Sequence, residues 1–177
     1  MFIVMIIVFV FLLILLLVFV VYFLFFVGRD YSAVYEQRLA SGEIKNPLEN
    51  LSVEEAVENF NEDFVYYFLV ANKAYNLRDT ILDDHPPHLE FNIDGEIYTG
   101  IIDDGEISVV KENRVDEDII ISTSKEEAVK MMLDDDYIEE SVANGATEIG
   151  LVASKTKLAA KGYLDLYEEM TGEKILF

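Results

Sequence analysis

Residues 89–111, LEFNIDGEIYTGIIDDGEISVVK, decide the fold class of this chain. Leu89, Phe91 and Ile93 alternate with polar residues, which is the period of a half-buried β-strand. Asp94-Gly95 is a strong signal for a two-residue hairpin turn, and the Asp-Asp-Gly sequence at 103–105 indicates a second turn. The stretch therefore predicts a three-stranded meander, with strands at 89–93, 96–102 and 106–111.

The sequence after the meander predicts two more strands and a set of short helices. The run Asp-Ile-Ile-Ile-Ser at 118–122 is typical of a short central strand, and residues 147–152 form a fifth strand. Ser124 and Glu127 form a capping box that opens a helix, and Asn144-Gly145 is a helix-ending signal. Helical spacing of apolar residues predicts helices at 124–133, 136–144, 154–161 and 163–170.

The sequence before the meander predicts one long helix. Ser52 and Glu55 form another capping box, and apolar residues then recur at helical spacing to about residue 76. Residues 77–88 follow as a loop, because Pro86 and Pro87 forbid a helix there. The whole order predicts an α+β domain, in which a five-stranded, mainly antiparallel sheet is covered by helices on one face.

Residues 1–27 are all apolar and carry no charge. A helix from Phe2 to Val27 would be about 39 Å long at 1.5 Å per residue, and the hydrocarbon core of a bilayer is about 30 Å thick. A cleaved signal peptide is the alternative, but it would need a basic start, a shorter apolar run and small residues before the cut. The segment 1–27 is therefore predicted to be a single-pass transmembrane anchor.

The charges beside this segment predict its orientation. Arg29, Arg38 and Lys45 follow it, and only the amino terminus precedes it. The positive-inside rule then places the C-terminal part in the cytoplasm. Residues 28–51 are predicted to be a juxtamembrane linker with a root-mean-square reach of about 25–30 Å, and residues 52–177 the folded domain. The 150 residues after the segment are about 43% apolar, which is ordinary for a globular domain.

The net charge is −21, from 34 Asp and Glu against 13 Lys and Arg. A field of that sign repels phosphate, so nucleic acid is not expected as a partner. The charge has two interpretations, a solvated acidic surface or a docking face for a basic protein partner. Cysteine is absent, which excludes disulfides, thiol catalysis and Cys-based metal sites.

The residues with the composition of a metal site are His85 and His88, preceded by Asp83 and Asp84. A catalytic zinc site takes three protein ligands and keeps one position open. The two prolines between the histidines impose an extended path on which neighbouring side chains point apart. These residues are therefore interpreted as the polar start of a strand, with a metal site as the weaker alternative. The chain has no phosphate-binding loop or dinucleotide fingerprint, and no cofactor is expected.

The remaining candidates are apolar side chains of the helices. They either fill a core or line a cavity for an apolar ligand, since ligand pockets are mostly apolar and methionine suits an adaptable wall. The candidate lining residues are Met131, Met132, Ile138, Val142, Leu158, Leu166, Tyr167 and Met170.

From Leu89 to about Gly172 the chain resembles the sterol carrier protein-2 (SCP2) domain. The likeness rests on the meander with its two turns, the strand at 118–122, the Ser-Lys-Glu-Glu helix start at 124–127, and the last helix from Gly162-Tyr163-Leu164. The resemblance implies a five-stranded sheet with helices over one face and an apolar tunnel for lipids, without catalysis. The family's glycine-containing stretch near the fifth strand is only partly present, at Gly145 and Gly150.

Three functions follow from the sequence. The first is a membrane-anchored domain that binds a lipid or other apolar ligand in a cavity between sheet and helices, without catalysis. The second is a membrane-tethered acidic module with a solid core that recruits a protein. The third is a metal-dependent hydrolase that uses His85 and His88.

Overall fold

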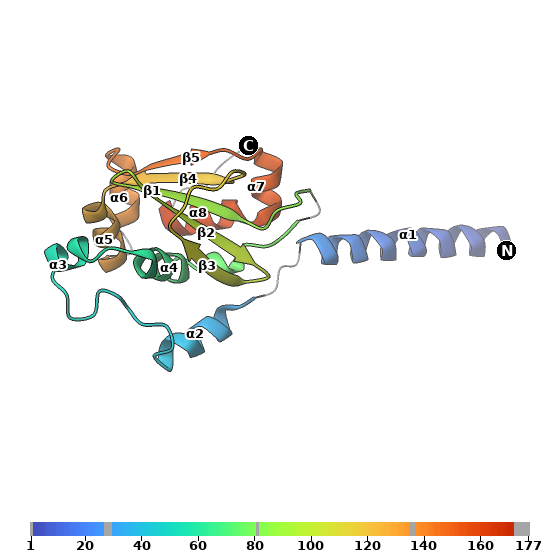
Figure 1. Ribbon diagram of the computed structural model, residues 1–177. Helices are drawn as coiled ribbons and strands as arrows, with labels where there is room; N and C mark the ends of the chain where they lie inside the picture. The colour runs from blue at the N-terminus through green and yellow to red at the C-terminus, as the bar shows by residue number, and fades with distance from the viewer. Residues whose placement is uncertain (1, 27–29, 81, 135–136, 172–177) are drawn as a thin grey trace.

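A computed structural model describes residues 2–26, 30–80, 82–134 and 137–171. Helix α1 (Phe2–Phe26) projects away from an α+β domain that contains the rest of the described chain (Figure 1). The sequence prediction of an α+β fold is confirmed. The domain has a sheet as one layer and helices as the other.

The described residues form a five-stranded mixed sheet in the order β3-β2-β1-β4-β5. The pairs β1–β2, β2–β3 and β4–β5 are antiparallel, and β1–β4 is parallel. The five predicted strands are all present, with ends that differ by a residue or two. Their bounds are β1 (His88–Ile93), β2 (Glu96–Asp103), β3 (Glu106–Val110), β4 (Ile119–Thr123) and β5 (Glu148–Leu151).

Both predicted hairpin turns occur in the meander. Asp94 and Gly95 have φ values of 51° and 81°, and Asp104 and Gly105 have values of 45° and 82°. Positive φ at both central residues is the type I′ conformation, whose twist matches that of the flanking strands. The turns therefore fix the register that pairs Phe91 with Tyr98.

The helices lie on one face of the sheet, as the sequence predicted. That face consists of alternate residues of neighbouring strands, including Leu89, Phe91 and Ile121, all buried. From the helices, Phe68 meets the ring of Phe91 edge-on at 5.8 Å. On the other face, the loop after β3 crosses the sheet, and the Thr99 hydroxyl donates to the Glu112 carbonyl at 2.7 Å.

The prediction of one helix over 52–76 was wrong. The segment forms α3 (Val53–Glu58), α4 (Glu62–Ala71) and a 3₁₀ turn, η1 (Ala74–Asn76). Asn59 ends α3 by donating its side-chain amide to the Glu55 carbonyl, and Asn61 begins α4 by accepting from the Asp63 amide. Asparagine side chains compete for backbone partners in this way and interrupt helices. The break lets Phe60 stack on Phe64 and lie edge-on to Tyr98.

The helices of the second half are found where the sequence predicted them, as α5 (Lys125–Leu133), α6 (Tyr137–Ala143), α7 (Lys155–Lys161) and α8 (Tyr163–Thr171). One detail of the capping box at 124–127 differs. Ser124 accepts from the Glu127 amide, but the Glu127 carboxylate accepts from the hydroxyls of Ser141 and Tyr137 instead of returning to Ser124. Glu127 therefore ties α5 to α6.

The stretch predicted as a flexible linker packs on the domain over its described residues. It contains α2 (Ser32–Ala40), and Tyr35, Ile44 and Leu48 are buried in the core. The Tyr35 ring stacks on that of Tyr75, with centroids 4.3 Å apart. Burial of these side chains outweighs the chain entropy that would keep a linker loose.

The side chains of α1 are described at Ile6 and from Val8 to Val20, and they are 45–66% exposed. Within the described residues, no helix has the length and hydropathy of a membrane crossing.

Candidate functional site

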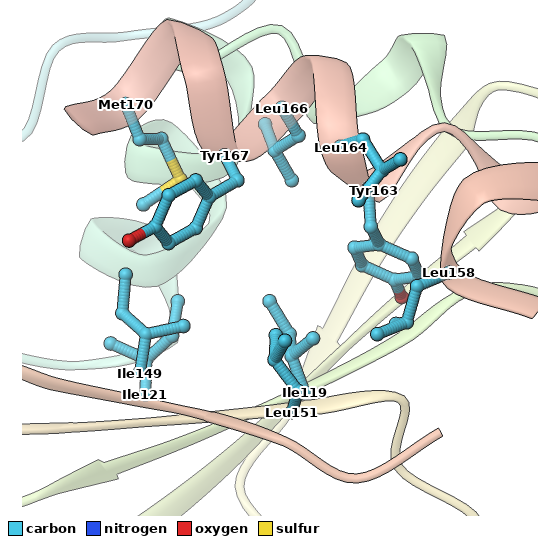
Figure 2. A pocket seen from close by; sticks show the side chains of 10 residues that line it. All are labelled: Ile119, Ile121, Ile149, Leu151, Leu158, Tyr163, Leu164, Leu166, Tyr167 and Met170. Atoms are coloured by element: carbon cyan, nitrogen blue, oxygen red, sulfur yellow. The ribbon is translucent and has the colours of Figure 1, made fainter. Parts of the chain in front are cut away.

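An apolar groove runs between α8 and the edge of the sheet formed by β4 and β5. Figure 2 shows side chains of α8 on one side of a central space and side chains of the two strands on the other. The lining residues are Ile119, Ile121, Ile149, Leu151, Leu158, Tyr163, Leu164, Leu166, Tyr167 and Met170.

Two periodicities in the sequence create this groove. Ile119 and Ile121 share one face of β4, and Ile149 and Leu151 share the same face of the neighbouring β5, because strand side chains alternate. In α8, Tyr163, Leu166, Tyr167 and Met170 fall on one stripe at spacings of three and four. Helix stripe and strand face then oppose each other across the groove.

The groove is narrow. The space between its walls is about 20 Å³, which is room for about one water molecule. Its rim is open at Leu151, whose side chain is 44% exposed at the end of β5. A space of this volume is too small for a lipid chain. A ligand would therefore have to move α8 away from the strands.

A second apolar cavity lies between the sheet and helices α4 and α5. Its lining includes Phe60, Phe68, Phe91, Met131 and Met132, and its volume is about 10 Å³. A space of that size is at the lower limit for one water molecule. This part of the interior is therefore a filled core.

The eight candidate lining residues are divided between these two places. Leu158, Leu166, Tyr167 and Met170 line the groove. Met131 and Met132 line the smaller cavity. The remaining two, Ile138 and Val142, pack into the core and line neither space.

Sequence reasoning missed the groove residues contributed by the strands and by the first turn of α8. They are Ile119, Ile121, Ile149, Leu151, Tyr163 and Leu164. The alternation in both strands was a usable signal, but only the sheet order places β4 beside β5.

A buried ionic network closes one end of the groove. The Lys161 ammonium, fully buried, lies 3.0 Å from both carboxylate oxygens of Asp118 and 2.8 Å from Asp83. Tyr163, which lines the groove, donates its hydroxyl to Asp118 at 2.9 Å. The backbone amide of His88 donates to the same carboxylate at 3.0 Å. The network joins β1, β4, α7 and the first residue of α8.

The network shifts the pKa values of its members. The hydrogen bond from Lys161 lowers the pKa of Asp83 to about 2. Burial, with the neighbouring Asp118 carboxylate, raises the pKa of Tyr163 well above its usual value. Asp83 is therefore an anion and Tyr163 a neutral donor at neutral pH, which is the pairing that the geometry requires.

A polar cleft of about 420 Å³ lies above this network. Asp83, Asp84, His85, Asp116 and Lys157 are among its lining residues. The His85 imidazole is 3.7 Å from the Asp116 carboxylate, and the His85 and His88 rings are 6.4 Å apart between centroids.

This cleft gives no support to the metal interpretation of His85 and His88. Burial lowers the pKa of His88, and its buried Nδ1 has no hydrogen-bond partner in the protein. Within the described residues, no three side chains of His, Asp or Glu are arranged to hold a metal ion.

No protein-family profile matches the chain, and neither does any curated protein. Among solved structures, the chain is similar to a protein described as "UbiJ-SCP2 Ubiquinone synthesis protein", with a TM-score of 0.37 and 12% sequence identity. The similarity covers 75% of this chain and 96% of that one.

Proposed function

We propose that this chain is a membrane-anchored, non-catalytic domain that binds one apolar, lipid-like ligand in the groove between α8 and strands β4 and β5. The observation that carries the proposal is the lining of the groove. Every lining side chain is apolar or a tyrosine, and the hydroxyl of Tyr163 is already bonded to Asp118. Such walls bind hydrocarbon and offer no strong site for a charged molecule.

Binding requires the groove to open, and different contacts hold the two ends of α8. Its first residue, Tyr163, is fixed by the buried network at Asp118. Near its last turn, Glu169 forms an ion pair with Lys73 in which both side chains are about half exposed. Exposed ion pairs contribute little to stability, so the main cost of moving this end is the exposure of Met170, which is buried. Burial of each ligand methylene then contributes about 0.8 kcal/mol.

Anchoring through residues 2–27 is part of the proposal. It is supported by the unbroken apolar sequence of residues 1–27 and by the exposure of the side chains from Val8 to Val20. Exposed apolar side chains are more stable in hydrocarbon than in water. The positive-inside rule, applied to Arg29, Arg38 and Lys45, places the domain in the cytoplasm.

Native mass spectrometry tests the ligand. The chain is expressed from residue 30, which keeps α2, and is purified without detergent. We expect a bound mass that matches a lipid and is lost on denaturation. A folded domain that carries no such mass and takes up no fluorescent fatty acid would contradict the proposal.

The second candidate, an acidic module with a solid core that recruits a basic protein, is favoured by one observation. The groove volume of about 20 Å³ is that of a nearly filled interior. The two candidates differ in their response to salt. Binding of a basic partner weakens steeply as ionic strength rises, whereas binding of an apolar ligand does not.

A further inference from the structure

The segment that joins α1 to the domain is short because α2 is docked. The Tyr31 hydroxyl donates to Asp104 at 2.8 Å, and the Tyr35 hydroxyl donates to the Gly105 carbonyl at 3.0 Å. The Tyr35 oxygen also accepts from the Ile107 amide at 3.2 Å. Both tyrosines thus hold α2 on the β2–β3 turn.

The close fit at this turn depends on glycine. A Cβ at residue 105 would lie 2.4 Å from the Tyr31 ring, and the residue has a φ of 82°. From Phe26, the last residue of α1, to Tyr31 the chain has five residue steps. Five extended steps span at most about 18 Å. A flexible linker over 28–51 would have reached much farther.

The turn lies at one end of the sheet, and the part of the groove lined by Leu151 lies at the same end. Leu151, at the end of β5, pairs with Ile119 at the start of β4. Leu89 pairs with Ile119 and with Gly100, in the half of β2 that leads to the turn. Three strand spacings of about 4.8 Å separate β2 from β5, so Gly100 and Leu151 are roughly 15 Å apart across the sheet. The turn residue Asp104 follows Gly100 by four positions in the chain.

Four exposed apolar side chains gather at this end of the domain. They belong to the loops before β1 and β4 and to the end of β5. Residues of all three segments, among them Asp83, Asp116 and Val152, line the same polar cleft. Their exposed fractions are 50% for Leu82, 80% for Val115, 44% for Leu151 and 52% for Val152. We call them the apolar rim. In Figure 1, α7 and the loop before β1 mark this end, on the side where α1 leaves the domain.

We propose that the apolar rim rests on the surface of a zwitterionic bilayer, held there by the short connection between α1 and the docked α2, so that the end of the groove lined by Leu151 and Tyr163 faces the membrane. The inference rests on the anchoring through α1 proposed above. Apolar side chains of a surface-bound segment enter the interface to a depth of about 5–10 Å. The carboxylates beside the rim, including Asp83, Asp84 and Asp116, favour a zwitterionic surface because an anionic one repels them.

Site-specific quenching tests this orientation, and the absence of cysteine makes single labels straightforward. Val115→Cys, Leu82→Cys and Leu133→Cys variants of the full chain each carry an environment-sensitive fluorophore. Leu133, at the end of α5, is the matched control, since it is apolar and 56% exposed but lies outside the rim. The chains are placed in phosphatidylcholine vesicles that contain a lipid with a nitroxide headgroup.

We expect the labels at Val115 and Leu82 to be quenched about fivefold more than the label at Leu133, because only the rim reaches the interface. Equal quenching of all three labels in chains that float with the vesicles would overturn the orientation and leave the anchor intact. Failure of the chains to float would overturn the anchor itself.

A flexible insertion between Arg29 and Asp30 should reduce the quenching at Val115 to the level at Leu133. Full quenching in that variant would overturn the role of the short connection.

Discussion

Lys161 and Asp118 are both buried, and the ammonium of the lysine lies 3.0 Å from each carboxylate oxygen of the aspartate. The two residues are 43 positions apart in the chain. Their pairing joins the C-terminal end of α7 to the start of β4, and through Tyr163 it fixes the first residue of α8. The end of the groove at Tyr163 is therefore held by buried polar contacts, whereas the far end of α8 is held by the burial of Met170 and by an exposed ion pair.

Lys161→Met should destabilise the domain by about 3–5 kcal/mol, because it leaves Asp118 buried without its counter-charge. Chemical denaturation measures the change in the free energy of unfolding. Lys157→Met is the control, since this lysine also pairs with Asp83 but its side chain is 40% exposed. The control should lose less than about 1 kcal/mol. Equal losses in the two variants would show that the buried pair has no special role.

The stability of the domain should fall as the pH drops from about 4 to about 2. The carboxyl of Asp83 has a pKa of about 2 in the folded protein, against 3.8 when unperturbed. The unfolded chain therefore takes up a proton first, and the stabilisation present above pH 4 is lost toward pH 2. Asp83→Asn should cost about 1–2 kcal/mol at neutral pH, since Asp118 still pairs with Lys161. Urea denaturation over this pH range should show a smaller loss of unfolding free energy in the variant than in the unmodified domain. The same loss in both proteins would refute the assignment of this pH dependence to Asp83.

Leu151→Glu should weaken the binding of a fluorescent fatty acid at least about tenfold, which corresponds to 1.4 kcal/mol. The substitution puts a charge at the half-exposed edge of the groove, where it costs little stability but opposes an apolar chain. Leu133→Glu carries the same change at an exposed residue outside the groove. Fluorescence titration measures the affinity of both variants for the fatty acid. Similar affinities in the two would contradict binding at this groove.

Gly105→Ala should cost about 1–3 kcal/mol, and Gly95→Ala about 1 kcal/mol. The two glycines hold the same position in the two hairpin turns and have almost the same φ, 82° and 81°. They differ in surroundings, because a Cβ at residue 105 meets the Tyr31 ring and one at residue 95 meets nothing within 4 Å. The difference in free energy of unfolding thus measures the docking of α2, and no difference would mean that Tyr31 contributes nothing to it.

The sequence by itself determined the meander, both turns, the later strands and the helices from α5 to α8. These elements depend on residues within a few positions of each other, such as the alternation at Leu89, Phe91 and Ile93 or the Asp94-Gly95 pair, and such signals are readable without the fold. The sequence also predicted four of the groove residues, because the stripe of α8 and Leu158 follow helical spacing. It did not predict the break at Asn59 and Asn61, where side-chain bonds to the backbone and the fit of Phe60 outweighed an apolar pattern that continues through the break.

Tertiary structure alone decided which distant segments meet. The pairing of Lys161 with Asp118, the docking of Tyr31 and Tyr35 on the β2–β3 turn, and the narrow space between α8 and the strands all join residues far apart in the sequence. Such contacts depend on the complementary shape and charge of whole surfaces, and a periodic pattern carries no information about the partner that a surface will find. The sequence shows that the stripe of α8 is buried, and only packing decides how much space remains beneath it.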